Sequence, residues 1–156
     1  MIVDLLLILV VLTNLRLLAT SRLGAGIRTV AAQGVLLGLL PLAIHLPHAS
    51  WRVLAMAAGS IVIKGILFPS LLFRALRDAD VSREIQPLVG YIASLAFGLA
   101  ALGMAVWFGG HLPLPMGVLS NWLVPVSFFC ILSGFFLIAA RRRAVTQVLG
   151  FLVLEN

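Results

Sequence analysis

Two ionisable side chains, Glu155 and Lys64, lie inside long apolar stretches of this chain of 156 residues. Glu155 follows the arginines at 141–143, and twelve residues of helix from a membrane surface would carry it about 18 Å inward, near the middle of a hydrocarbon layer. A carboxylate at that depth is costly unless it faces protein or water, and such groups usually mark an ion or proton path. We therefore interpret Glu155 as a candidate proton-transfer residue, with a structural ion pair as the alternative.

Lys64 is the second charge at membrane depth. It lies thirteen residues after Trp51 and ten before Arg74, which is too far from either end for its ammonium to reach the interface fully. It could act as a proton-relay amine or as the counter-ion of a carboxylate on another helix. The alternative is an ion pair, or an amine bonded to carbonyls, that fixes helix packing. Gly65 and Pro69 weaken the helix here and could free carbonyls to solvate the charge.

Three amide side chains are further candidates for a polar path through the membrane. Gln147 lies two turns before Glu155 and could extend a hydrogen-bonded route toward it, although a packing role is equally open. Asn14 and Gln33 are also buried polar candidates, for which hydrogen bonds between helices are the favoured interpretation. The pair of glycines in Gly34-x-x-x-Gly38 predicts a close approach of two helices.

The composition places all of these residues in a membrane. Of all residues 62% are hydrophobic and 10% are charged, with a mean hydropathy of +1.18, whereas an average soluble domain has about 25% charged residues. The net charge of +6 is not the footprint of a nucleic-acid-binding protein, because the basic residues lie in short connections between apolar runs. We predict an all-α integral membrane protein in which residues 1–156 form a single membrane domain.

Apolar length predicts about five transmembrane helices plus the first half of a sixth. The sixth looks cut short, and we expect either a longer natural polypeptide or a separate chain that supplies the missing helices. The expected spans are 2–19, 27–46, 51–73, 85–108 and 116–140, with the sixth starting near 144.

The arginines predict how these helices are oriented. Nine arginines flank or fill the first, third and fifth connections, whereas the second and fourth hold only Arg52. Because cytoplasmic loops carry an excess of Lys and Arg, the odd-numbered connections are expected in the cytoplasm and the N-terminus outside. The predicted location is the inner (cytoplasmic) membrane of the cell, crossed several times.

The third connection mixes acidic and basic residues. Arg77, Asp80, Arg83 and Glu84 alternate in sign over eight residues. A solvated loop is the simple interpretation, and a docking surface for a cytoplasmic subunit is the more specific one.

Cofactor chemistry finds little support within the chain. Cys130 is the only cysteine, so an intrachain disulfide and a redox dithiol are both excluded. The histidines at 45, 48 and 111 fall at the outer ends of helices, which argues against a haem or metal site. We expect no cofactor and no catalytic residue in this chain.

The run from residue 135 to the end of the chain resembles the component E subunit of hydrogenase-4. That family is related to the small K-type subunit of respiratory complex I and to the C-type subunit of multisubunit cation/proton antiporters. The shared element is an arginine-bearing cytoplasmic turn that leads into a helix with an intramembrane glutamate. The residues that carry the resemblance are the arginines at 141–143, Glu155, the string from Gln147 to Asn156, Lys64 with Pro69, and Arg83-Glu84 with Pro87 opening the fourth helix.

The resemblance implies a membrane-arm subunit of a membrane-bound nickel–iron hydrogenase or a formate-hydrogenlyase-like complex. Glu155 matches the first of two intramembrane glutamates of the complex I subunit, and the second has no counterpart here. The implied partners are antiporter-like and other membrane subunits, a cytoplasmic hydrogenase arm and the lipid bilayer, with nickel–iron and iron–sulfur centres in the partner subunits. Two alternatives stay open, namely a structural scaffold of the same arm and a component of a cation/proton antiporter.

Overall fold

The computed structural model describes residues 1–45, 50–78, 89–112 and 120–156, and it builds them almost entirely from helices. Among these described residues, five helical stretches are long and apolar enough to cross a membrane, so the chain is an all-α membrane protein. They are α1 (Ile2–Ala19), α2 (Leu23–His45), the continuous stretch α3 (Trp51–Ser60), η2 (Ile61–Leu67) and α4 (Phe68–Asp78), α5 (Tyr91–His111) and α6 (Leu123–Ala140). The shorter helix α7 (Ala144–Glu155) follows α6.

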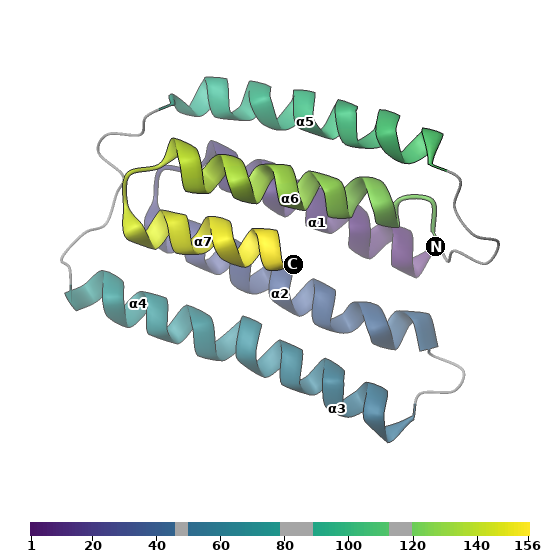
Figure 1. Cartoon of the computed structure of the whole chain (residues 1–156). Helices are drawn as coiled ribbons and strands as arrows, with labels where there is room; N and C mark the ends of the chain where they lie inside the picture. Colours follow the sequence, from purple (N-terminus) through teal and green to yellow (C-terminus); the bar gives the residue numbers. More distant parts are fainter. Residues whose placement is uncertain (46–49, 79–88, 113–119) are drawn as a thin grey trace.

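The helices lie roughly side by side along one common direction (Figure 1). The stretch α3–η2–α4 forms one edge of the bundle and packs against α2, while α5 forms the opposite edge and packs against α1 and α6. The helix α7 folds back along α6 and also contacts α2 and α4, and it ends part of the way along the bundle (Figure 1). Apolar side chains such as Leu12, Ile66 and Phe135 are exposed on the outside, as expected where lipid is the solvent.

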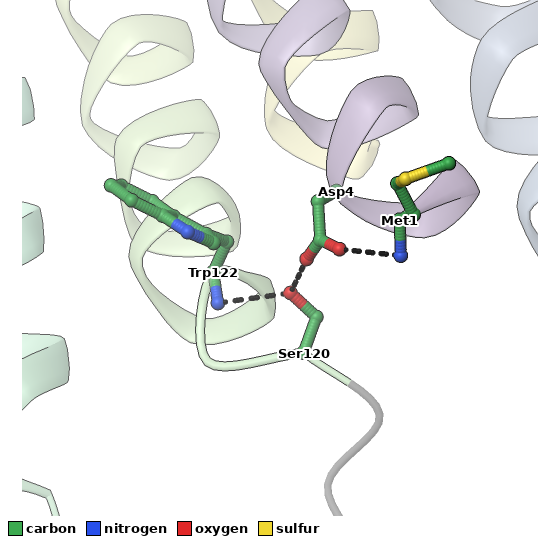
Figure 2. Close-up of polar contacts among 4 residues, drawn as sticks. All are labelled: Met1, Asp4, Ser120 and Trp122. Atoms are coloured by element: carbon green, nitrogen blue, oxygen red, sulfur yellow. Dashed lines mark hydrogen bonds and ion pairs between the residues drawn. The ribbon is translucent and has the colours of Figure 1, made fainter.

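Polar contacts hold both ends of α1. At its start, the Asp4 carboxylate accepts a hydrogen bond from the Ser120 hydroxyl at 2.7 Å and pairs with the amino group of Met1 at 2.9 Å (Figure 2). The Ser120 oxygen also accepts the backbone N–H of Trp122 at 3.1 Å, which ties the start of α6 to the start of α1 (Figure 2). At the other end of α1, the Leu18 carbonyl accepts a hydrogen bond from Arg141.

The boundaries differ from the predicted ones mainly at helix starts. The first helix, the end of the fifth and the start of the sixth lie where the sequence predicts them. The second begins at Leu23, earlier than predicted, because Gly26 is buried against the side chains of Leu17 and Leu149 and so belongs to the packed helix. The third stretch continues to Asp78, beyond the predicted residue 73, because the apolar pattern stops before the helix does.

The fourth and fifth predicted spans begin too early. The helix α5 starts at Tyr91, with Gly90 as its N-cap at φ −59° and ψ 155°. Arg83-Glu84 and Pro87, which were expected to open this helix, lie outside the described residues. The helix α6 starts at Leu123, after the turn that Ser120 closes, and not near residue 116. In both cases the residues that precede the helix are also apolar, so the hydropathy signal begins before the helix does.

Candidate functional site

The structure brings Glu155 and Lys64 together. The ammonium nitrogen of Lys64 on η2 lies 3.3 Å from Oε1 of Glu155 on α7. The same nitrogen donates a hydrogen bond of 2.9 Å to Oδ1 of Asn156. The Lys64 side chain is 21% exposed and that of Glu155 is 46% exposed, so the pair lies at the surface of the helix bundle on one side. The contact agrees with a counter-ion on another helix and equally with a structural ion pair that fixes helix packing, so both sequence interpretations stay open.

Two glycines set the position of α7, and with it the position of Glu155. A Cβ atom on Gly134 of α6 would lie 2.7 Å from the carbonyl oxygen of Gly150 on α7. A Cβ atom on Gly150 would in turn lie 2.9 Å from the carbonyl oxygen of Gly134. The two backbones are thus in direct contact, a packing that only small residues allow between membrane helices. This contact lies just over one turn of α7 before Glu155.

A second pair of glycines sets the position of Lys64. A Cβ atom on Gly34 of α2 would lie 2.6 Å from Cβ of Lys64, and one on Gly38 would lie 2.5 Å from Cγ1 of Ile61. The close helix approach predicted from Gly34-x-x-x-Gly38 is therefore confirmed, and its partner is η2. Because the glycines of α2 allow this contact, Cβ of Lys64 lies directly against α2, and its ammonium extends to the end of α7.

The segment around Lys64 is a π-helix, Ile61–Leu67, inside an otherwise α-helical stretch. The backbone N–H of Phe68 bonds to the carbonyl of Ile63, five residues back. A π-helical turn holds one more residue than an α-helical turn, and such segments occur often at functional sites. The sequence predicted a weakened α-helix at Gly65 and Pro69. The structure has the wider π-helix at this place.

Asn14 and Gln33 form a separate buried polar cluster with Cys130. The Gln33 amide donates to Oδ1 of Asn14 at 3.3 Å, and the Asn14 amide donates to the sulfur of Cys130 at 3.1 Å. The cluster joins α1, α2 and α6, and all three residues are nearly inaccessible to solvent. Asn14 and Gln33 therefore bond between helices, as the sequence suggested. Cys130 is more than a small packing residue, because it accepts a hydrogen bond.

Gln147 closes the turn between α6 and α7. Its side-chain amide donates to the backbone carbonyl of Arg141 at 3.2 Å. That carbonyl follows the end of α6, so the bond satisfies an acceptor that the helix leaves open. In the described part of the chain, the geometry supports a local role for Gln147.

Arg141 is the residue that sequence reasoning missed. Its side chain is only 2% exposed, although it belongs to a run of three arginines that predicts a water-facing turn. Its Nη2 atom donates to the Leu18 carbonyl at 3.1 Å, and its guanidinium lies 4.5 Å from the ring centre of Tyr91. Within the described ranges, Nε and Nη1 have no hydrogen-bond partner. Arg141 thus joins α1 and α5 to the α6–α7 turn, and no feature of the triple arginine distinguishes it beforehand.

The candidate docking residues are only partly described. Arg77 is exposed on α4, whereas Asp80, Arg83 and Glu84 lie outside the described residues. Where the chain is described, no group of three or more His, Cys, Asp or Glu side chains could hold a metal ion.

Comparison with known proteins identifies a relative in Mycobacterium tuberculosis, named uncharacterized protein Rv0085. It is 31% identical to this chain over 149 residues, which are 94% of the chain and 67% of that protein. No family model matches the chain. No solved structure matches it.

Proposed function

The chain belongs to the family of the mycobacterial protein Rv0085, and we propose that it serves as a membrane-arm subunit of a complex I-like, membrane-bound hydrogenase. In that role it contributes to proton translocation that is coupled to redox chemistry in partner subunits. The observation that carries the proposal is the ion pair of Lys64 and Glu155, which joins two apolar helices far from either end of the longer one.

Membrane energetics support a functional role for this pair. Two ionisable groups in apolar helices are expensive to keep, and an all-apolar contact would join the helices at lower cost. A carboxylate and an amine in contact can exchange and pass protons through hydrogen bonds. Glu155 is the residue that loads and releases the proton, and Lys64 is the cation that stabilises its charged form.

The arginine distribution supports an orientation with the N-terminus outside and the α6–α7 turn in the cytoplasm. Protons then reach Glu155 from the cytoplasmic side of the inner membrane. The nickel–iron and iron–sulfur centres belong to partner subunits. Arg77, Asp80, Arg83 and Glu84 belong to the cytoplasmic connection that would face the hydrogenase arm.

The test is proton movement in membrane vesicles that hold the assembled complex. The Glu155→Gln variant is expected to lose most redox-coupled proton movement, followed with a pH-sensitive dye, while the complex assembles normally. Ser127→Ala is the matched control, because Ser127 is exposed on α6 and bonds only to the Leu123 carbonyl of its own helix. Full coupling in an assembled Glu155→Gln complex would refute the proposal.

A structural scaffold is the second candidate, and the same contact favours it, because the pair and Asn156 connect η2 to α7. The double variant Lys64→Met/Glu155→Met separates the two functions. A scaffold would assemble and turn over normally when both charges are removed together, since no buried charge is left unpaired. A proton carrier would assemble but remain uncoupled.

A further inference from the structure

The ammonium of Lys64 contacts two side-chain oxygens at the end of α7. It lies within 3.3 Å of a carboxylate oxygen of Glu155 and within 2.9 Å of the amide oxygen of Asn156. Carboxylate and amide oxygens are the ligands that hard metal cations prefer. We propose that Lys64 is a tethered cation that fills this position, so that the site takes protons and excludes sodium and potassium ions.

The proposal deepens the proposed function by naming the coupling ion, and it rests on that function only in treating Glu155 as the coupling residue. The physical basis is like-charge repulsion. A metal cation bound to the same two oxygens would lie within a few ångströms of the ammonium, in surroundings that screen charge far less than water. Either the ammonium leaves or the metal ion stays out.

The packing around Lys64 holds the ammonium in place. Cβ of Lys64 lies against Gly34, where even one additional carbon atom on α2 would be 2.6 Å away. The lysine stem therefore starts from a fixed point, and its ammonium has the oxygens of Glu155 and Asn156 as polar partners. Exposed apolar side chains of the same segment, such as Ile63 and Ile66, indicate that its surroundings are apolar. An ammonium that left the oxygens would face an apolar environment, which is unfavourable for a charge.

Protons are not subject to this exclusion. A proton binds one carboxylate oxygen through a single bond and needs no shell of several ligands. The half of the Glu155 side chain that this chain leaves uncovered is where the proton arrives, through a partner subunit of the assembled complex. Protonation makes the carboxyl neutral, and the ammonium keeps its hydrogen bond to Asn156. The site can therefore load and release protons while Lys64 remains in place.

The experiment measures equilibrium binding of radioactive sodium to the full chain in lipid nanodiscs. The wild type and Lys64→Arg, which keeps a cation, are expected to show no saturable sodium binding. Lys64→Met should bind sodium saturably, because the repulsion from the ammonium is gone. Its dissociation constant should be at least about tenfold below the highest sodium concentration at which the wild type shows no binding. Adding Glu155→Gln to Lys64→Met should abolish that binding. Arg28→Met is the matched control, since it removes an exposed cation from α2 and should behave as the wild type.

Two outcomes overturn the proposal. One is saturable sodium or potassium binding to the wild type that Glu155→Gln removes. The other is a folded Lys64→Met chain that binds no sodium, which would mean that the oxygens alone do not form a cation position. If Lys64→Met does not fold, Lys64→Gln is used in its place. The glutamine is also neutral, and its amide can still donate a hydrogen bond to Asn156. A coupled Glu155→Gln complex would refute the proposed function and leave this ion-binding result standing, so the two failures are distinguishable.

Discussion

Gly134 and Gly150 meet backbone to backbone where α7 crosses α6, and each leaves no room for a Cβ atom on the other. This contact decides where α7 lies, and therefore whether Glu155 can reach Lys64. Helix contacts of this kind depend on close van der Waals packing, because the lipid removes the hydrophobic driving force between membrane helices.

Replacing Gly150 by Ala should lower stability by about 1–3 kcal/mol, because the added carbon meets the Gly134 carbonyl at 2.9 Å and the Leu137 side chain at the same distance. Thermal unfolding in detergent, followed by tryptophan fluorescence, measures the change. Gly103→Ala on α5 is the matched control, because in the described part of the chain no atom beyond its own helical turn lies within 4 Å of the position of its Cβ. Equal unfolding temperatures for the two variants would contradict the contact.

Replacing Lys64 alone by Met should destabilise the chain, because the Glu155 carboxylate loses its cation in an apolar environment. We expect on the order of 1–2 kcal/mol, less than for a fully buried pair, because the protein covers only about half of the Glu155 side chain. Adding Glu155→Met should restore most of that loss. A double-mutant cycle from thermal unfolding gives the coupling energy, and a value near zero would show that the pair does not interact.

Replacing Asn14 by Leu should cost about 1–3 kcal/mol, because the buried Gln33 amide would lose its oxygen acceptor and keep the long 3.9 Å contact to the sulfur of Cys130. The double variant Asn14→Leu/Gln33→Leu should recover part of this loss if the added volume is tolerated. Thr13→Val is the control, since Thr13 bonds only to the carbonyl of Val10 on its own helix. A loss for Thr13→Val as large as that for Asn14→Leu would count against the cluster.

Replacing Arg141 by Ala should cost about 2–4 kcal/mol, because the residue is buried and joins Leu18 of α1 to Tyr91 of α5. Arg141→Lys should recover only part of this, since an ammonium lacks the flat guanidinium that stacks on an aromatic ring. Arg28→Ala, on an exposed position of α2, should change stability by less than about 0.5 kcal/mol. A comparable effect at both positions would show that burial does not distinguish Arg141.

The amino-acid sequence by itself determined the class of this protein and its main charged residues. Apolar length and charge placement are local properties, so α1, the end of α6 and the start of α7 could be located residue by residue. Glu155 and Lys64 were recognisable for the same reason, because each interrupts an apolar run. The starts of α5 and α6 could not be located from the sequence. Apolar residues precede both helices, and hydropathy does not distinguish a helix from an apolar segment before it.

Only the tertiary structure decided which polar groups meet. Lys64 and Glu155 belong to helices far apart in the chain, and glycine contacts that involve α2 and α6 bring them within 3.3 Å. In the same way, packing made Arg141 the buried one of three adjacent arginines, because its side chain extends back to Leu18 of α1 and Tyr91 of α5, whereas Arg142 is exposed. The physical reason is that burial and pairing depend on the relative placement of helices, which lipid-exposed apolar sequences specify only weakly.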